Sequence, residues 1–120
     1  MDPVDLPFAE AHVREALEIQ QVLGRYMADA LEGIAALMTA LGRPAEAVPI
    51  WGRARRLRDE SGTAMEVPDQ RRYERQLTAA RRALRDDAAF DAAWNEGRLL
   101  PLDQVVAACV DLVRGSTTAR

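Results

Sequence analysis

Residues 41–54 read Leu-Gly-Arg-Pro-Ala-Glu-Ala-Val-Pro-Ile-Trp-Gly-Arg-Ala, and they carry more information about the fold than any other stretch. A periodic apolar segment ends there at a glycine, the residue that most readily adopts the left-handed backbone closing a helix. A second helix is expected a few residues later, with small side chains at Ala47 and Ala54 and an aromatic one at Trp51 between them. Because small residues let two helix axes approach closely, the pattern predicts a tightly packed antiparallel helix pair.

Length and composition agree with a single helical domain. A chain of 120 residues with 48% hydrophobic residues can bury a core of its own. Alanine is frequent and β-branched residues are sparse, which favours helices over strands. We therefore expect an all-α fold with no strand.

Glycine and proline divide the sequence into six predicted helices. Gly24, Gly42, Gly62, Gly97 and Gly115 each follow an apolar-periodic stretch, and Pro7, Pro68 and Pro101 each precede one. The predicted helices span residues 8–23, 25–41, 45–60, 68–85, 87–96 and 102–114, in one domain over residues 1–114. Residues 115–120 are expected to form a disordered tail.

The second and third predicted helices together resemble a tetratricopeptide (TPR) unit. With Gly42 as the turn glycine, the sizes that this repeat requires fall on Leu31, Ala35, Met38, Ala47, Trp51 and Ala54. The first predicted helix, with Ala9, Val13 and Ala16 at the same spacing, resembles the second half of a preceding unit. The resemblance implies antiparallel helix pairs in a TPR-like superhelical bundle of about six helices.

About 85 residues, from Ala28 to Val113, also resemble a narrower group. The pattern Phe-x3-Trp-x2-Gly-Arg at 90–98 and the following Leu-Pro-Leu-Asp-Gln-Val-Val at 100–106 are similar to the C-terminal helical-repeat region of large actinobacterial regulators. These are multidomain LuxR-type or ATPase-linked transcriptional and signalling proteins. The resemblance implies a regulatory array without a catalytic centre. It does not carry DNA binding to these residues, because the helix-turn-helix of such activators follows this region.

The resemblance also suggests where a partner would bind. In TPR arrays the first helix of each pair lines the concave groove, which would place Asp29, Glu32 and Thr39 on a partner-binding face. We expect the partner to be another protein or neighbouring repeats of a larger regulator, and a homo-oligomer built through the open first helix is a further expectation.

Charge is distributed unevenly along the chain. The formal net charge is −3, all 16 basic residues are arginine, and residues 51–85 hold 10 arginines against 5 acidic residues. The arginines of this band most relevant to binding are Arg53, Arg56, Arg71, Arg75 and Arg82. Nearby acidic residues could pair with them and leave a solvated face, or the band could bind acidic protein surface. A nucleic-acid-binding accessory domain that uses the arginine band 53–85 is the alternative function.

Residue types that usually carry chemistry are few. His12 is the single histidine and is interpreted as a surface residue, since metal sites need three or four converging ligands. Cys109 is the single cysteine and is expected to be a buried apolar residue. No Gly-rich phosphate loop, nucleophile elbow or zinc spacing is present in the sequence. We predict a non-enzymatic cytoplasmic protein-interaction module with no cofactor, no metal and no membrane span.

Overall fold

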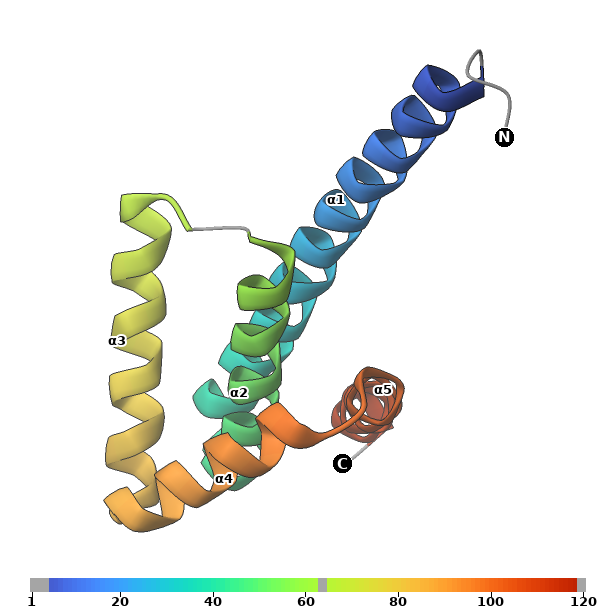
Figure 1. Cartoon of the computed structure of the whole chain (residues 1–120). Helices are drawn as coiled ribbons and strands as arrows, with labels where there is room; N and C mark the ends of the chain where they lie inside the picture. The colour runs from blue at the N-terminus through green and yellow to red at the C-terminus, as the bar shows by residue number, and fades with distance from the viewer. Residues whose placement is uncertain (1–4, 63–64, 119–120) are drawn as a thin grey trace.

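The computed structural model describes residues 5–62 and 65–118, and over these residues the protein is all-helical (Figure 1). Its elements are α1 (Asp5–Ala40), α2 (Pro44–Ser61), α3 (Val67–Leu84), α4 (Asp87–Leu99) and α5 (Leu102–Thr118). No strand occurs in the described ranges, as the composition predicted.

Helix α2 is central, and the other helices are arranged around it (Figure 1). It returns antiparallel along the C-terminal half of α1 after a short turn at Gly42, whose φ of 75° is the left-handed value expected there. Helix α3 lies beside α2, α4 crosses α2, and α5 follows after Pro101. The N-terminal half of α1 extends beyond the other helices, and we call residues 9–23 the arm.

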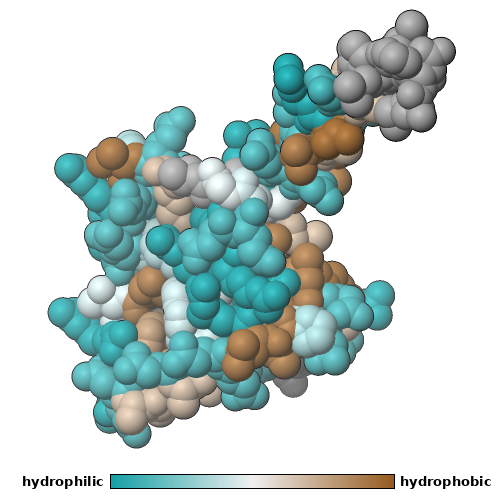
Figure 2. All heavy atoms as spheres, viewed as in Figure 1, coloured by the Kyte–Doolittle hydropathy of each residue, from teal (hydrophilic) through white to brown (hydrophobic). Residues whose placement is uncertain are grey.

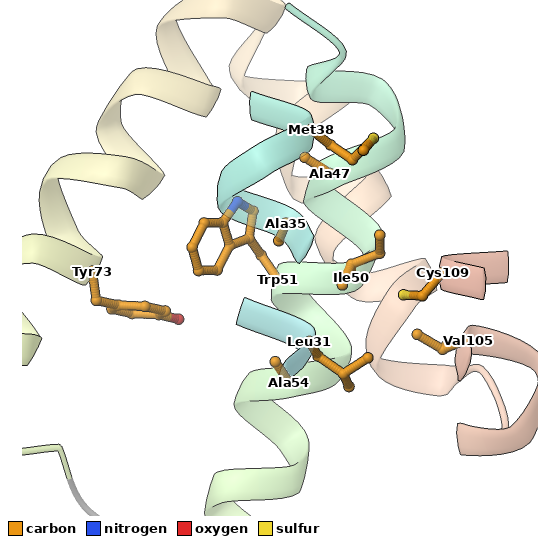
Figure 3. Close-up of a cluster of buried hydrophobic side chains, with 10 residues drawn as sticks. All are labelled: Leu31, Ala35, Met38, Ala47, Ile50, Trp51, Ala54, Tyr73, Val105 and Cys109. Atoms are coloured by element: carbon orange, nitrogen blue, oxygen red, sulfur yellow. The ribbon is translucent and has the colours of Figure 1, made fainter. Parts of the chain in front are cut away.

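The main core lies where α1, α2, α3 and α5 meet. Its buried members are Leu31, Ala35, Met38, Ala47, Ile50, Trp51, Ala54, Tyr73, Val105 and Cys109. All six residues that matched the repeat pattern belong to this set. Figure 3 shows Trp51 pointing toward Tyr73, whereas Val105 and Cys109 of α5 lie near Ile50. A second cluster of Val48, Ala80 and Phe90 joins α2, α3 and α4.

Two glycines set the crossing of α2 and α4. A Cβ atom on Gly52 would overlap the backbone carbonyl of Trp94, and a Cβ atom on Gly97 would overlap the backbone of Pro49. Each helix thus presents a glycine to the backbone of the other. This contact accounts for two glycines inside helices, where the residue costs about 1 kcal/mol relative to alanine.

One continuous helix replaces the first two predicted helices, so the described chain has five helices instead of six. Residues 8–23 and 25–41 were expected to be separated at Gly24, but α1 runs from Asp5 to Ala40 without interruption. Gly24 is buried inside α1, and a Cβ atom there would lie 2.7 Å from Cβ of Ser61. The glycine therefore serves a close contact with the end of α2 and does not end a helix.

Glycines inside helices also explain why the predicted and observed helix ends differ in the C-terminal third of the chain. Gly97 was predicted to end the helix over 87–96, but α4 continues to Leu99. Gly115 lies inside α5, which extends to Thr118, so residues 115–118 of the predicted disordered tail are helical. The rest of that tail, residues 119–120, lies outside the described residues. Pro49 sits in the interior of α2, which begins at Pro44.

The predicted end of α2 at Gly62 is confirmed, and the start of α4 has a side-chain cap. Gly62 closes α2 with a φ of 66°, and its N–H donates to the carbonyl of Arg58. Asp86 caps α4, since its carboxylate accepts a hydrogen bond of 3.1 Å from the N–H of Ala89.

Replacing Gly97 by alanine tests the α2–α4 crossing. The added methyl group collides with the Pro49 backbone, which cannot move without separating the helices, so we expect Gly97→Ala to lower the free energy of unfolding by about 1–3 kcal/mol. Gly33→Ala is the matched control, because a Cβ atom added there would meet nothing within 4 Å. The control should raise stability by up to about 1 kcal/mol through helix propensity. Urea denaturation followed by circular dichroism measures the free energy of unfolding of both variants. Equal changes in the two variants would contradict the close contact between Gly97 and the Pro49 backbone.

Candidate functional site

A cleft opens between α1 and α3, with α2 as its floor, and has a volume of about 330 Å³. We call it the α1–α3 cleft. Its lining consists of Asp29, Glu32, Gly33 and Ala36 from α1, Trp51 and Arg58 from α2, and Met65, Asp69, Arg72, Tyr73 and Gln76 from α3 and the loop before it. The volume lies at the lower end of the range found for ligand sites in proteins.

A buried charge cluster forms one wall of the cleft. Arg58 is 7% exposed and binds Glu32 through two hydrogen bonds of 2.7 Å, from Nε and from Nη2. The Nη2 atom also donates to Oδ1 of Asp29 at 2.5 Å. The hydrogen bonds that Arg58 donates to Glu32 outweigh desolvation and raise the pKa of Arg58 above its ordinary value, so the guanidinium stays charged. One arginine therefore fixes the two α1 carboxylates onto α2.

Aromatic side chains form the floor. The rings of Trp51 and Tyr73 meet edge to face, with centroids 5.5 Å apart and an interplanar angle of 77°. The Tyr73 hydroxyl is buried without a hydrogen-bond partner in the described part of the chain. Desolvation raises the pKa of Tyr73 to about 12, so this hydroxyl keeps its proton at neutral pH and remains a donor.

The outer part of the cleft is polar. Arg72 pairs with Asp69 at 3.1 Å, and both side chains are more than half exposed. Gln76 stands one turn further along α3 and offers an amide group. Trp51 is 0% and Tyr73 8% exposed, so the floor itself is packed inside the protein. The charged and amide groups at the entrance can hold a short peptide segment by hydrogen bonds.

Three of the predicted partner-binding residues, Asp29, Glu32 and Thr39, lie on α1, and two of them line the cleft. Asp29 and Glu32 line the cleft. Thr39 does not line it. Its hydroxyl donates to the Ala35 carbonyl at 2.8 Å and accepts a hydrogen bond of 3.3 Å from Nε1 of Trp51. Thr39 thus helps to position the Trp51 side chain through this hydrogen bond.

Two arginines of the band have a structural role within the protein. Arg53 is 6% exposed and donates from Nε to the Leu100 carbonyl at 2.9 Å, and Arg56 donates from Nη1 to the Arg98 carbonyl at 2.7 Å. These carbonyls belong to the C-terminal end of α4, where backbone acceptors have no partner within the helix and the dipole favours positive charge. Arg53 and Arg56 are therefore caps for α4, and Arg53 is not available as surface.

The other three arginines face outward. Arg71, Arg75 and Arg82 are exposed on α3, away from the cleft, and no hydrogen bond or ion pair is found for them within the described residues. The five candidate arginines of the band thus fall into two groups. Arg53 and Arg56 on α2 bind the end of α4, whereas the other three lie on the outer face of α3.

Arg58 and Tyr73 line the cleft but were not among the candidate binding residues predicted from the sequence. Arg58 follows Ala54 by four residues and Trp51 by seven, so it lies on the buried face of α2. A charged residue at a core position requires a partner of opposite charge, and that signal could have indicated an acidic side chain on the facing helix.

The remaining candidate residues have surroundings that suit their expected roles. His12 is exposed on the arm. Cys109 is buried, and desolvation raises the pKa of its thiol, which disfavours the reactive thiolate. Among the described residues, no three or more His, Cys, Asp or Glu side chains are grouped so that they could hold a metal ion. No described helix is both long and apolar enough to cross a membrane.

Comparison with known proteins points to transcriptional regulators. The chain is 32% identical over 98 residues, 82% of its length, to the "Putative HTH-type transcriptional regulator Rv0890c" of Mycobacterium tuberculosis H37Rv and to the "Putative HTH-type transcriptional regulator Mb0914c" of Mycobacterium bovis. The aligned stretch covers 11% of each relative, so the chain corresponds to a small part of those proteins. No family model matches the chain, and no solved structure matches it. The described chain is therefore all-helical, and the chain is related to a segment of proteins that are named as transcriptional regulators and not as enzymes.

Removing the buried guanidinium tests the charge cluster. We expect Arg58→Met to lower the free energy of unfolding by about 3–5 kcal/mol at neutral pH, because Glu32, whose side chain is 13% exposed, would keep its charge without a partner. Arg72→Met is the matched control, since it breaks the exposed pair with Asp69 and should cost less than about 1 kcal/mol. Chemical denaturation of the two variants gives the comparison. Similar losses would show that the cluster does not stabilise the fold.

Proposed function

We propose that the chain is a non-catalytic regulatory module, the helical-repeat part of a larger transcriptional or signalling regulator, and that it binds a protein segment in the α1–α3 cleft. The observation that carries the proposal is the cleft itself, where Arg58 holds the carboxylates of Asp29 and Glu32 in place at one wall. Similarity to a segment of transcriptional regulators supports the regulatory role.

The antiparallel pairing of α1 with α2 supports the TPR-like part of the proposal, because it corresponds to one unit of such an array. Helix α4 packs on α2 and meets α3 only near its end, so α3 and α4 do not form a second unit of this kind. The cleft lies beside α1, the first helix of the pair, which is the helix that lines the partner-binding groove in arrays of this kind. The cytoplasmic location expected from the sequence belongs to the same proposal.

Site-specific cross-linking tests the cleft directly. A photoreactive amino acid at Gln76, inside the cleft, should capture a protein partner in extracts of a bacterium that produces the chain. The same amino acid at Glu74, which is exposed on another face of α3, is the matched control and should capture far less. Equal capture at both positions, or none at Gln76, would contradict binding in the cleft.

A charge reversal at Asp29 sharpens this experiment. The side chain of Asp29 is 58% exposed, and Glu32 retains its two hydrogen bonds to Arg58 when Asp29 is changed, so Asp29→Lys should leave the fold intact. We expect it to abolish most of the capture at Gln76, because the cleft entrance changes from acidic to basic. Reversing Glu32 is unsuitable, because Glu32 accepts two hydrogen bonds from Arg58 and its side chain is only 13% exposed.

A second candidate function, binding of nucleic acid, rests on the outer face of α3. Arg71, Arg75 and Arg82 lie on one side of this helix, about 6 and 10 Å apart along its axis, and are free to contact phosphates. The net charge of −3 opposes such binding over the whole surface.

Gel retardation across a salt series separates the two functions. The protein-binding proposal predicts no retardation of duplex DNA or RNA at low micromolar protein and moderate salt. Nucleic-acid binding through α3 predicts retardation that weakens with salt, and replacing all three arginines by glutamine should reduce the slope of log K against log salt by about 2–3. A slope that the triple variant leaves unchanged would exclude the α3 face.

A further inference from the structure

The α1–α3 cleft contains more carboxylate groups than guanidinium groups. Its lining includes Asp29, Glu32 and Asp69 but two arginines, Arg58 and Arg72. Glu32 uses both of its oxygens for Arg58, so its charge is compensated inside the protein. The two aspartates differ from it, because among the described residues each accepts a hydrogen bond at Oδ1 and none at Oδ2. The cleft therefore keeps unused acceptor atoms and a surplus of negative charge.

These two aspartates stand on different walls of the cleft and are open to solvent. Asp29 belongs to α1 and Asp69 to α3, and both side chains are more than half exposed. Figure 2 shows hydrophilic side chains over much of α2 and α3 on the face in view. Negative charge on two walls of one cleft attracts a cation, and the attraction grows where the walls exclude water. The entrance is thus complementary to a basic group.

A second observation in the same cleft points to a bound group. Tyr73 lines the cleft and is more than nine-tenths buried, and its hydroxyl has no hydrogen-bond partner among the described residues. Figure 3 shows this hydroxyl pointing from α3 toward α2. Desolvation raises the pKa of Tyr73 to about 12, against the lowering effect of the nearby Arg55, so the hydroxyl keeps its proton. Arg55 cannot accept that proton, since a guanidinium group only donates hydrogen bonds. The hydroxyl therefore lacks an acceptor, such as a peptide carbonyl.

We propose that the segment bound in the α1–α3 cleft contains a basic residue, whose cation lies between Asp29 and Asp69 and whose backbone carbonyl accepts the hydroxyl proton of Tyr73. This inference rests on the proposed function and adds the chemistry of the partner. One lysine or arginine supplies both a cation and a carbonyl oxygen. An acidic residue supplies the carbonyl but brings a charge of the wrong sign to the aspartates. A neutral residue leaves the surplus charge of the cleft uncompensated.

Peptide titrations of the full chain test the chemistry of the occupant. The probes are end-blocked alanine pentapeptides whose central residue is lysine, glutamine or glutamate. Nuclear magnetic resonance of the labelled protein follows the side-chain amide of Gln76 in the cleft, with the amide of Asn95, exposed on α4, as the control signal. The lysine peptide should shift the Gln76 signal alone, with a dissociation constant at least about tenfold below that of the glutamine peptide. The glutamate peptide should not saturate the cleft, and added salt should weaken the lysine peptide.

Three variants test the assigned contacts. Asp69→Asn should weaken binding of the lysine peptide at least about fivefold, whereas Glu74→Gln, exposed on another face of α3, should not change it. Tyr73→Phe should also weaken the peptide at least about fivefold. It should leave the urea midpoint unchanged or raise it, because it removes a buried hydroxyl that has no partner in the free protein. A tyrosine with a structural role alone would instead lower the midpoint and leave binding unchanged.

The inference is overturned if the lysine peptide does not bind, or binds no more tightly than the glutamine peptide. Saturable binding of the glutamate peptide at Gln76 would also overturn it, yet would leave the proposed function intact, because the cleft would still hold a protein segment. Equal effects of Asp69→Asn and Glu74→Gln, or unchanged binding by Tyr73→Phe, would exclude the assigned contacts. The proposed function itself is rejected by a different result, the absence of cross-linked partner at Gln76.

Discussion

Close approach of helix backbones at α2 is the constraint on which the other features depend. Gly52 and Gly97 bring α2 and α4 together, and Ala35, Ala47 and Ala54 occupy the interface between α1 and α2. Short interaxial distances place the α4 carbonyls within reach of Arg53 and Arg56. They also bring Arg58 to the carboxylates of α1. Larger residues at these positions would separate the helices and break both sets of hydrogen bonds.

The buried core could be predicted because its residues follow spacing and size patterns between near neighbours in the sequence. Periodicity identified the helices from about residue 25 onward, and the size pattern from Leu31 to Ala54 selected residues that the structure buries. Helix ends were less predictable, since a glycine that closes a helix and a glycine that admits a neighbour look alike in sequence. Gly42 and Gly62 have positive φ and end helices, whereas Gly24 is helical and contacts Ser61, a residue 37 positions away. Only the tertiary contact distinguishes the two uses.

The cleft was only partly predictable. The resemblance to TPR arrays singled out Asp29 and Glu32, and both residues line the cleft. Their pairing with Arg58 depends on the distance between α1 and α2 in space. The arginine band illustrates the same limit: six of its members have partners on α2, α3, α4 or α1, and a run of charges in the sequence does not show which will turn inward.

The charges of α1 and α2 differ in how far they are paired inside the protein. In the C-terminal half of α1, Glu32 is bound by Arg58, so the acidic character of the cleft comes mainly from the more exposed Asp29. Both buried arginines of α2 have partners on other elements or on α2 itself: Arg58 binds two α1 carboxylates, and Arg53 donates to the Leu100 carbonyl and lies 3.6 Å from the Glu60 carboxylate. A buried guanidinium without partners costs free energy that folding must supply. The partners therefore allow α2 to carry two charges on its packed faces while it remains the central helix.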